Sequence, residues 1–267
     1  SWYGPNNAVL VLAGDIDVAT AKEKVTRYFG DIPASATLAD MKTHIPKHAQ
    51  DTRETIPDRV PQVRLYRGWP VAEMGTRDAA LLDLFAQVLG GSAAARFDTR
   101  LVHGDKIADQ ASAYQWSSEI SGTFFLVSTV KEGVDPAKVE KALDEELKRL
   151  IAEGPTADEL ERAKVAGRAA FVRGIERIGG FGGKSDVLAS CAVYQGTPDC
   201  YQEELDILAN ATAADVQAAA KKWLAGASHT ILVQPSETPA SALPETVIVA
   251  LATTPAATPK VDPKFKT

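Results

Sequence analysis

Two histidines four residues apart form the arrangement most suggestive of chemistry in this chain. They stand in the run His44-Ile45-Pro46-Lys47-His48. In an H-x-x-E-H zinc site, two such histidines on one helical turn bind the metal, and the glutamate serves as general base. Here Lys47 replaces the glutamate, and a cation neither accepts a proton nor favours a nearby metal ion. Pro46 would also disrupt the helix that must present both imidazoles. We therefore interpret the pair as a chance match and predict no metal site in this chain.

A glycine-rich run at residues 179–185 resembles a phosphate-binding loop. The motif G-x-x-x-x-G-K-[ST] requires glycine where Ile178 stands, and it should follow a strand instead of the helix expected here. A hinge between two helices is the interpretation that we adopt. The other histidines, His103 and His229, are far apart in the sequence, and no serine or cysteine lies in a nucleophile motif. The sequence therefore predicts no catalytic residue.

The two cysteines, Cys191 and Cys200, flank a turn predicted by Gly196 and Pro198, so their thiols could meet across it. A disulfide between them would place the protein in an oxidising compartment such as a bacterial periplasm. Alternatively both thiols are free, one on a helix and one beside a loop. Spacing alone does not decide, because a disulfide requires specific geometry. A metal site made of these two ligands alone is disfavoured.

The composition is that of a globular protein with a sizeable core. Of the 267 residues, 45% are hydrophobic and 24% are charged. The formal net charge of −6 argues against a nucleic-acid partner, and the sequence has no basic stripe with interleaved aromatic residues. No apolar run approaches the ~18 residues that a membrane-spanning helix requires. We expect neither a nucleic-acid partner nor a membrane span.

The first residues predict a strand followed by a helix. Residues 8–13 are an unbroken apolar run between turn residues, which is typical of a buried strand. Gly14 and Asp15 end the run, and Asp17 can cap a helix over residues 19–29. A strand, turn and helix at the first residues suggest that the chain begins in the middle of a fold.

A second, larger α/β region is predicted downstream. Residues 34–57 lack periodicity and contain scattered prolines, so we interpret them as a linker. Thr156 and Glu159 form a capping box that should begin a long helix. The predicted strands are residues 60–66 (ended by Trp69 and Pro70), 123–130 and 230–233, and the other predicted helices are residues 76–89, 137–152 and 212–223.

The residues around the first strand also carry a family resemblance. Tyr3, Pro5-Asn6-Asn7, Gly14-Asp15 and the run YFGDIP at residues 28–33 resemble the Y-x-P-N-N-x…G-D…Y-F-G-x-I-P signature of pitrilysin-type zinc peptidases. That family includes insulysin and the mitochondrial processing peptidases. Further runs at residues 88–97 and 156–164 resemble the family's L-G-G…S-R-L-F and T-x-x-E-L-x-x-A-K elements. The resemblance covers roughly residues 2–235.

The resemblance implies an α+β fold in which an antiparallel sheet packs against helices, in the duplicated-domain architecture of LuxS-like and processing-peptidase-like proteins. An internal similarity agrees with duplication, since residues 17–25 and 135–142 each follow an apolar strand and open a helix after an aspartate cap. The implied segments are the last strand and helix of a truncated zinc-bearing domain (1–35), a linker (36–58), a complete second α/β domain (59–235), and a Pro/Ala/Thr-rich tail or inter-unit linker (236–267).

The implied function is that of a segment of a zinc-dependent endopeptidase that supplies a wall of the substrate chamber without the zinc site. Zinc is expected in the full-length parent, and no cofactor in this chain. Family members hold substrate with an arginine and a tyrosine that are missing from residues 123–127 and 131–133, which fits the zinc-bearing half of a tandem enzyme. The alternative is a non-catalytic scaffold or partner subunit of a processing-peptidase-like complex. A free-standing binding domain is disfavoured because the first strand lacks its own sheet.

Four residues of the glycine-rich element, Gly90, Gly91, Ser92 and Arg96, are candidate substrate-chamber residues, because the corresponding loop of processing peptidases is associated with substrate. A helix cap followed by a flexible turn is the alternative interpretation. The expected partners are a peptide substrate, the upstream zinc-bearing part, and a second family unit in cis or as a partner subunit. We expect the protein in the bacterial periplasm, with the cytoplasm as the alternative.

Overall fold

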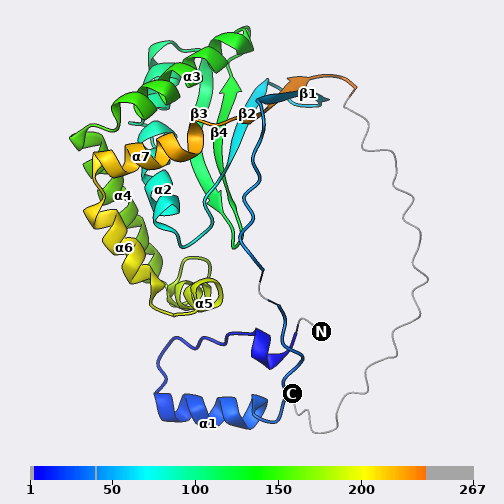
Figure 1. Ribbon diagram of the computed structural model, residues 1–267, viewed down its shortest axis with the longest axis vertical. Coiled ribbons are helices and arrows are strands. Elements are labelled where there is room, and N and C mark those ends of the chain that lie inside the picture. The colour runs from blue at the N-terminus through cyan, green and yellow to red at the C-terminus, as the bar shows by residue number, and fades with distance from the viewer. Residues whose placement is uncertain (1–2, 40, 239–267) are drawn as a thin grey trace.

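A five-stranded sheet forms the centre of the computed structural model, which describes residues 3–39 and 41–238 (Figure 1). The strand order is β1-β5-β2-β4-β3. Neighbouring strands run antiparallel, except that β1 and β5 are parallel. This mixed, mostly antiparallel sheet with its helices confirms the predicted α+β fold. The strands are β1 (Thr52–Asp58), β2 (Arg64–Val71), β3 (Ala108–Ser117), β4 (Gly122–Val130) and β5 (His229–Pro235).

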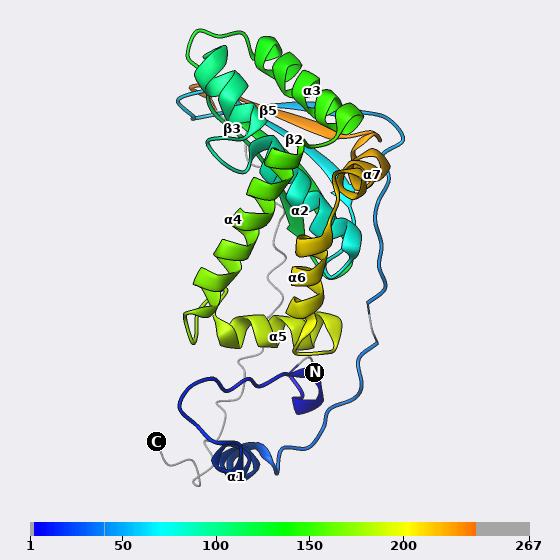
Figure 2. The ribbon, with the colours of Figure 1, turned by 90° about the vertical axis from the view of Figure 1, so that its left-hand side faces the viewer.

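Helices cover one face of the sheet (Figures 1 and 2). Helices α2, α3 and α7 lie over the strands, and α4, α5 and α6 extend the helical layer beyond the end of the sheet. No helix in the described ranges is both long and apolar enough to cross a membrane. The helices are η1 (Pro5–Asn7), α1 (Val18–Phe29), α2 (Arg77–Gly90), the π-helix η2 (Asp98–Gly104), α3 (Pro136–Glu153), α4 (Ala157–Ile175), α5 (Lys184–Gln195), α6 (Cys200–Asn210) and α7 (Ala213–Leu224).

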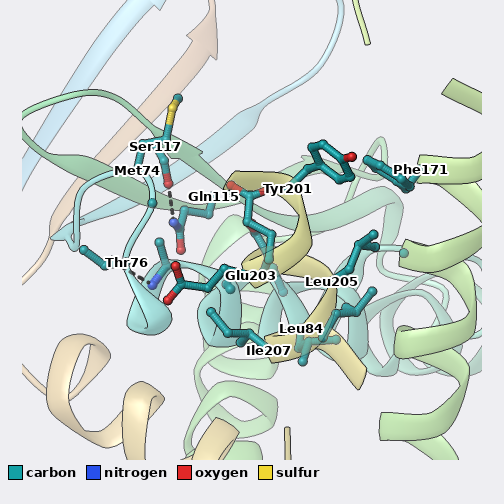
Figure 3. Close-up of a pocket in the computed structure, with 18 of the residues that line it drawn as sticks. Met74, Thr76, Leu84, Gln115, Ser117, Phe171, Tyr201, Glu203, Leu205 and Ile207 are labelled. Carbon is teal, nitrogen blue, oxygen red and sulfur yellow. Dashed lines mark hydrogen bonds between the residues drawn. The ribbon is translucent and has the colours of Figure 1, made fainter. Parts of the chain in front are cut away.

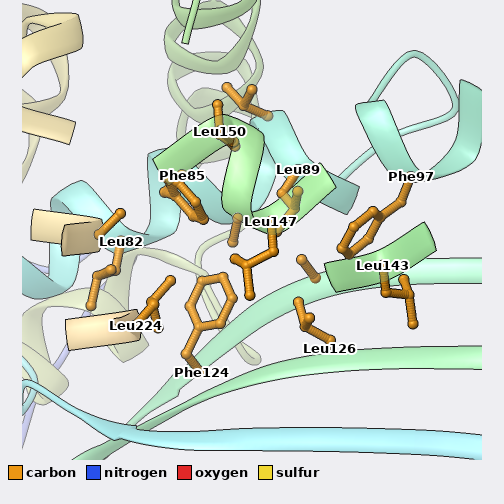
Figure 4. Close-up of a cluster of buried hydrophobic side chains, with 14 of the residues drawn as sticks. Leu82, Phe85, Leu89, Phe97, Phe124, Leu126, Leu143, Leu147, Leu150 and Leu224 are labelled. Atoms are coloured by element: carbon orange, nitrogen blue, oxygen red, sulfur yellow. The ribbon is translucent and has the colours of Figure 1, made fainter. Parts of the chain in front are cut away.

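The core lies between the helices and the sheet (Figure 4). Strand β4 alternates buried and half-buried residues, so Phe124 and Leu126 point into the core. The Phe124 ring packs edge-on against Trp69 with ring centroids 6.3 Å apart, and it contacts Phe85 of α2 at 6.0 Å. The predicted strand at residues 123–130 and the predicted helix at residues 76–89 therefore meet as the core of the domain.

Side-chain caps stabilise the first turns of α4 and α7. The Thr156 hydroxyl accepts a hydrogen bond from the Glu159 backbone N–H, and the Glu159 carboxylate accepts one from the Thr156 backbone N–H. Thr212 and Asp215 make the same reciprocal pair at the start of α7. Each pair satisfies backbone donors that the first turn of a helix otherwise leaves free. The capping box predicted at Thr156 and Glu159 is confirmed.

The predicted buried strand at residues 8–13 is wrong for the described chain. The segment is extended but pairs with no strand among the described residues, and Val9, Leu10 and Leu12 are 45%, 56% and 48% exposed. An extended segment becomes a strand only when a neighbour takes up its backbone hydrogen bonds. Helix α1 does form, with the Asp17 carboxylate accepting from the Thr20 backbone N–H at 2.9 Å, yet it buries no residue.

Part of the predicted linker at residues 36–58 is also wrong, because Thr52–Asp58 forms β1 at the edge of the sheet. Its side chains are almost all exposed, so the sequence shows no apolar alternation.

Strand β2 runs past the end predicted at Trp69 and Pro70. Its ladder with β5 stops at Gly68, so the missing N–H of Pro70 costs no hydrogen bond on that side. The predicted tail lies outside the described residues from residue 239 onward.

Candidate functional site

The face of the sheet opposite the helices gathers aromatic and branched side chains. The half-buried residues of β4, Phe125 and Val127 among them, point away from the core. The strand register places Tyr66 opposite both Val127 and Ile231, and it places Tyr114 opposite Phe125. The Tyr114 and Phe125 rings stack with centroids 5.3 Å apart. We call this surface, defined by Tyr66, Tyr114, Phe125, Val127 and Ile231, the open face.

The segment before β1 runs beside the open face. The His44 backbone N–H donates to the Ile120 carbonyl at 2.9 Å, and the Thr43 hydroxyl donates to the Glu73 carboxylate at 3.2 Å. Four residues further on, His48 helps to line a small cavity of about 200 Å³ against the strands. Residues 43–48 therefore lie against the sheet as an extended segment instead of a helix. The cavity is lined by His48, Tyr66, Arg67, Gly68, Pro70, Thr123, Phe125, His229 and Ile231.

The residues of this small cavity do not fit zinc. It brings His48 near His229, but its lining offers no carboxylate or thiolate. His44, the other half of the sequence pair, lies in an extended segment and shares no helical face with His48. Among the described residues, no group of three or more histidine, cysteine or acidic side chains is placed to hold a metal ion. The donor set needed for a zinc site is therefore not assembled there.

The predicted substrate-loop residues lie on the helical side of the sheet, away from the open face. Gly90 is buried at the end of α2, where a Cβ atom would stand 2.4 Å from the Ala113 backbone nitrogen in β3. Gly91 follows as the cap residue, and its N–H donates to the Gln87 carbonyl at 3.2 Å. Ser92 is exposed. Gly90 therefore allows close packing of helix on strand, which is a structural use of the residue.

Arg96 forms a two-pronged ion pair with Glu159. The distances are 2.8 Å from Nε to Oε1 and 2.8 Å from the terminal guanidinium nitrogen to Oε2. This contact, together with the Thr156 backbone N–H, lowers the pKa of the Glu159 carboxyl to about 2. The pair joins the loop after α2 to the start of α4. With its charge paired in this way, Arg96 acts as a structural residue in the described chain.

Cys191 and Cys200 form a disulfide with Cα atoms 5.3 Å apart. The bond joins α5 to the first residue of α6, across the turn at Gly196, whose φ of +72° lies in the left-handed region. Both cysteines are buried, at 4% and 6% exposure. The disulfide therefore fixes the hairpin of α5 and α6 at the outer end of the helical layer.

Removing this disulfide is expected to cost stability. A double replacement, Cys191→Ala with Cys200→Ala, should lower the free energy of unfolding by about 2–3 kcal/mol, because the unfolded chain regains the entropy of a short closed loop. Urea unfolding of the oxidised protein and the variant measures the difference. Adding a reductant should shift the midpoint of the wild type and leave that of the variant unchanged. Equal midpoints for oxidised wild type and variant would contradict the expectation.

Sequence reasoning missed the residues that make up much of the open face. Strand β3, which carries Tyr114 and Trp116, was not anticipated, although the run from Ala111 to Trp116 does alternate small buried residues with larger outward ones. The period-two pattern of small residues was the available signal. The approach of His48 to His229 could not be read from the sequence, because the two residues are brought together only by the parallel pairing of β1 with β5.

The comparisons with known proteins agree with this architecture. The sequence matches the family described as the peptidase M16 inactive domain over residues 1–166, so the chain belongs to that family, the inactive domain of pitrilysin-type zinc proteases. This confirms the resemblance drawn from the sequence motifs. A comparison with curated protein sequences found no match.

Three solved structures share the fold. A protease from Helicobacter pylori has a TM-score of 0.74 and 19% identity, with coverage of 88% of this chain and 57% of that one. A peptidase M16 inactive domain from Pseudomonas fluorescens has a TM-score of 0.69 and 17% identity, covering 84% and 52%. Complex III2 from Candida albicans has a chain with a TM-score of 0.69 and 12% identity, covering 82% and 53%. The chain thus spans little more than half the length of these proteins.

Proposed function

We propose that this domain forms one wall of the peptide chamber of a longer zinc-dependent endopeptidase and performs no hydrolysis itself. The observation that carries the proposal is the open face, a sheet surface that no helix within residues 3–39 and 41–238 covers and that Tyr66, Tyr114 and Phe125 line. A contiguous apolar surface of this kind marks a contact site for another chain. Its aromatic and branched side chains bind by contact and cannot activate a water molecule. Zinc and the general base would come from another unit of the parent protein.

The first described segment supports docking against that unit. Residues 8–13 are extended and apolar, and α1 adds Val18, Tyr28 and Phe29 with exposures of 71%, 63% and 53%. Apolar residues in this number are normally buried in an assembled protein. We propose that residues 1–35 complete the zinc-bearing unit, that the segment before β1 connects it to the sheet domain, which begins at Thr52, and that residues 236–267 lead onward. A second family unit, in cis or as a partner subunit, would close the chamber.

A non-catalytic scaffold is the second candidate. The similarity to a chain of complex III2 from Candida albicans favours it, because that chain is part of a complex. The two candidates predict different motifs in the zinc-bearing unit to which residues 1–35 would belong. An intact H-x-x-E-H with a downstream glutamate in that unit would indicate the peptidase, and its loss would indicate the scaffold.

The disulfide supports a location in an oxidising compartment. Cys191 and Cys200 are bonded to each other, and such bonds persist in secreted and periplasmic proteins but are rare in a reducing cytoplasm. We propose a bacterial periplasmic location. Free thiols at both positions in protein isolated under alkylating conditions would favour the cytoplasm instead.

Binding of an unstructured peptide tests the role of the open face. Phe125→Ser should weaken binding about fivefold, because it removes the aromatic contact at the middle of the surface. Fluorescence anisotropy of a labelled peptide provides the measurement. Val193→Ser is the matched control, since Val193 is 54% exposed on α5, away from the open face, and should change affinity by less than about twofold. Equal effects of the two variants would overturn the proposed role of the open face.

A further inference from the structure

A cavity of about 650 Å³ on the helical side of the sheet has no part in the proposed wall function (Figure 3). It is lined by residues of α2 and the turn before it, the end of β3, α4, the last residue of α5, and α6. It lies on the helical side of the sheet, and Tyr114 of the edge strand β3 belongs both to its lining and to the open face. A volume of this size accommodates a small organic ligand or a long side chain.

The charge in this cavity is of one sign. Asp83 from α2 and Glu203 and Glu204 from α6 line it, and no lysine, arginine or histidine of the described chain does. Glu204 accepts a hydrogen bond from the Gln195 amide at 3.3 Å. Asp83 and Glu203 have neither a hydrogen-bond donor nor an ion-pair partner among the described residues. Elsewhere the acidic residues near the core are paired, as Glu159 is with Arg96.

A buried amide oxygen adds an unmet acceptor. Gln115 of β3 lines the cavity, and its Oε1 atom is buried without a hydrogen-bond partner among the described residues. Its Nε2 atom already donates to the Ser117 hydroxyl. A buried acceptor without a donor costs free energy unless a ligand or water satisfies it. This oxygen and the carboxylates all require a donor, so the cavity is matched to a ligand that donates hydrogen bonds.

The remaining walls are apolar and aromatic. The rings of Phe171 in α4 and Tyr201 in α6 stack with centroids 5.8 Å apart, and both line the cavity. Leu84 and Ile207 are buried beside them (Figure 3). Aromatic faces attract cations, and apolar walls accept methylene groups. A hydrated inorganic ion would gain nothing from such walls, whereas an alkyl chain ending in a cationic group would contact both surfaces.

The carboxyl of Asp83 reflects this environment. Partial desolvation by the neighbouring groups and the like charge of Glu204 raise the pKa of Asp83 to about 7, although the residue keeps an exposed surface. A bound cation would relieve both effects. A positive partner, which the described chain does not supply, would favour the ionised form of Asp83.

We propose that this cavity binds an alkyl ammonium or guanidinium group, with Asp83 and Glu203 as its charge partners and the Phe171–Tyr201 pair against its methylene chain. Two sources carry this chemistry, namely the lysine or arginine side chain of a peptide and a free polyamine.

Calorimetric titration at pH 8 tests the proposal with three probes: Nα-acetyl-lysine amide, spermidine, and the neutral analogue Nα-acetyl-norleucine amide. We expect saturable binding of at least one cation and none of the neutral analogue. Asp83→Asn should weaken cation binding about tenfold, since it removes the charge and keeps the shape. The matched control, Asp206→Asn, changes an acidic residue on α6 that does not line the cavity and should leave the affinity unchanged. Tighter binding of the lysine derivative would assign the site to peptides, and tighter binding of spermidine to polyamines.

The pH dependence gives a second readout. The other ionisable groups lining the cavity are Glu203, Glu204 and Tyr201 on α6 and Tyr114 on β3, and α4 contributes none. Because Asp83 takes up a proton below about pH 7, cation affinity of the wild type should fall between pH 8 and pH 6, and that of Asp83→Asn should change less. No saturable binding, equal binding of the norleucine derivative, an unaltered affinity in a folded Asp83→Asn variant, or displacement by Mg²⁺ at a lower concentration than the organic cation would each overturn the proposal.

Discussion

Replacing Phe124 by alanine is expected to lower the free energy of unfolding by about 3–5 kcal/mol, because it removes a large ring from the fully packed core. Phe124 has no exposed surface and contacts both Trp69 and Phe85. The cavity left behind would lie between sheet and helices, where the strand backbone limits collapse. Denaturant unfolding followed by circular dichroism measures the change.

The neighbouring residue offers a matched control. Phe125 carries the same side chain on the same strand but points to the open face, where it is half-buried. Phe125→Ala should therefore cost less than about 1.5 kcal/mol. Equal losses for the two variants would contradict the assignment of the two faces of β4.

Replacing Gly90 by valine is expected to cost about 3 kcal/mol or more, because the added side chain meets backbone that cannot easily move. Its Cβ atom would stand 2.4 Å from the Ala113 nitrogen and 2.8 Å from the Ser112 carbonyl carbon. Helix α2 would have to shift away from β3. Thermal and urea unfolding of the variant measure the loss.

This substitution also separates the two interpretations of the glycine-rich element. Ser92→Val, two residues away and exposed, should change stability by less than about 0.5 kcal/mol. If Gly90→Val folded with unchanged stability and lost only peptide binding, the residue would belong to a substrate site, as its resemblance to the processing-peptidase loop suggests. A large loss of stability would support its structural role.

Elements with a strong local pattern could be predicted from the sequence. The alternating residues of β4, the stripe of α2 and the capping boxes at Thr156 and Thr212 each depend on neighbours within one helical turn or one strand. The signature turn makes a longer-range contact. The Asn6 side chain accepts from the Ser35 N–H at 2.9 Å and donates to the Ser35 carbonyl at 3.1 Å, which closes the loop around α1.

Features that depend on distant pairing could not be predicted. Strand β1 is held by backbone bonds to β5 and leaves no apolar pattern, and the apolar residues 8–13 have a strand-like pattern without a neighbour in the described chain. The cation cavity joins Asp83 and Glu203, which are far apart in the sequence and meet only because α6 packs on α2. Periodicity indicates which side of an element is buried but not which element covers it.

The metal content of the purified chain, measured together with cleavage of a quenched fluorogenic peptide, tests the central claim of a non-catalytic domain most directly. We expect less than about 0.1 zinc atom per chain and no cleavage that a chelator abolishes, because the described residues assemble no zinc donor set. Near-stoichiometric zinc with chelator-sensitive cleavage would contradict the account and would direct attention back to His44 and His48.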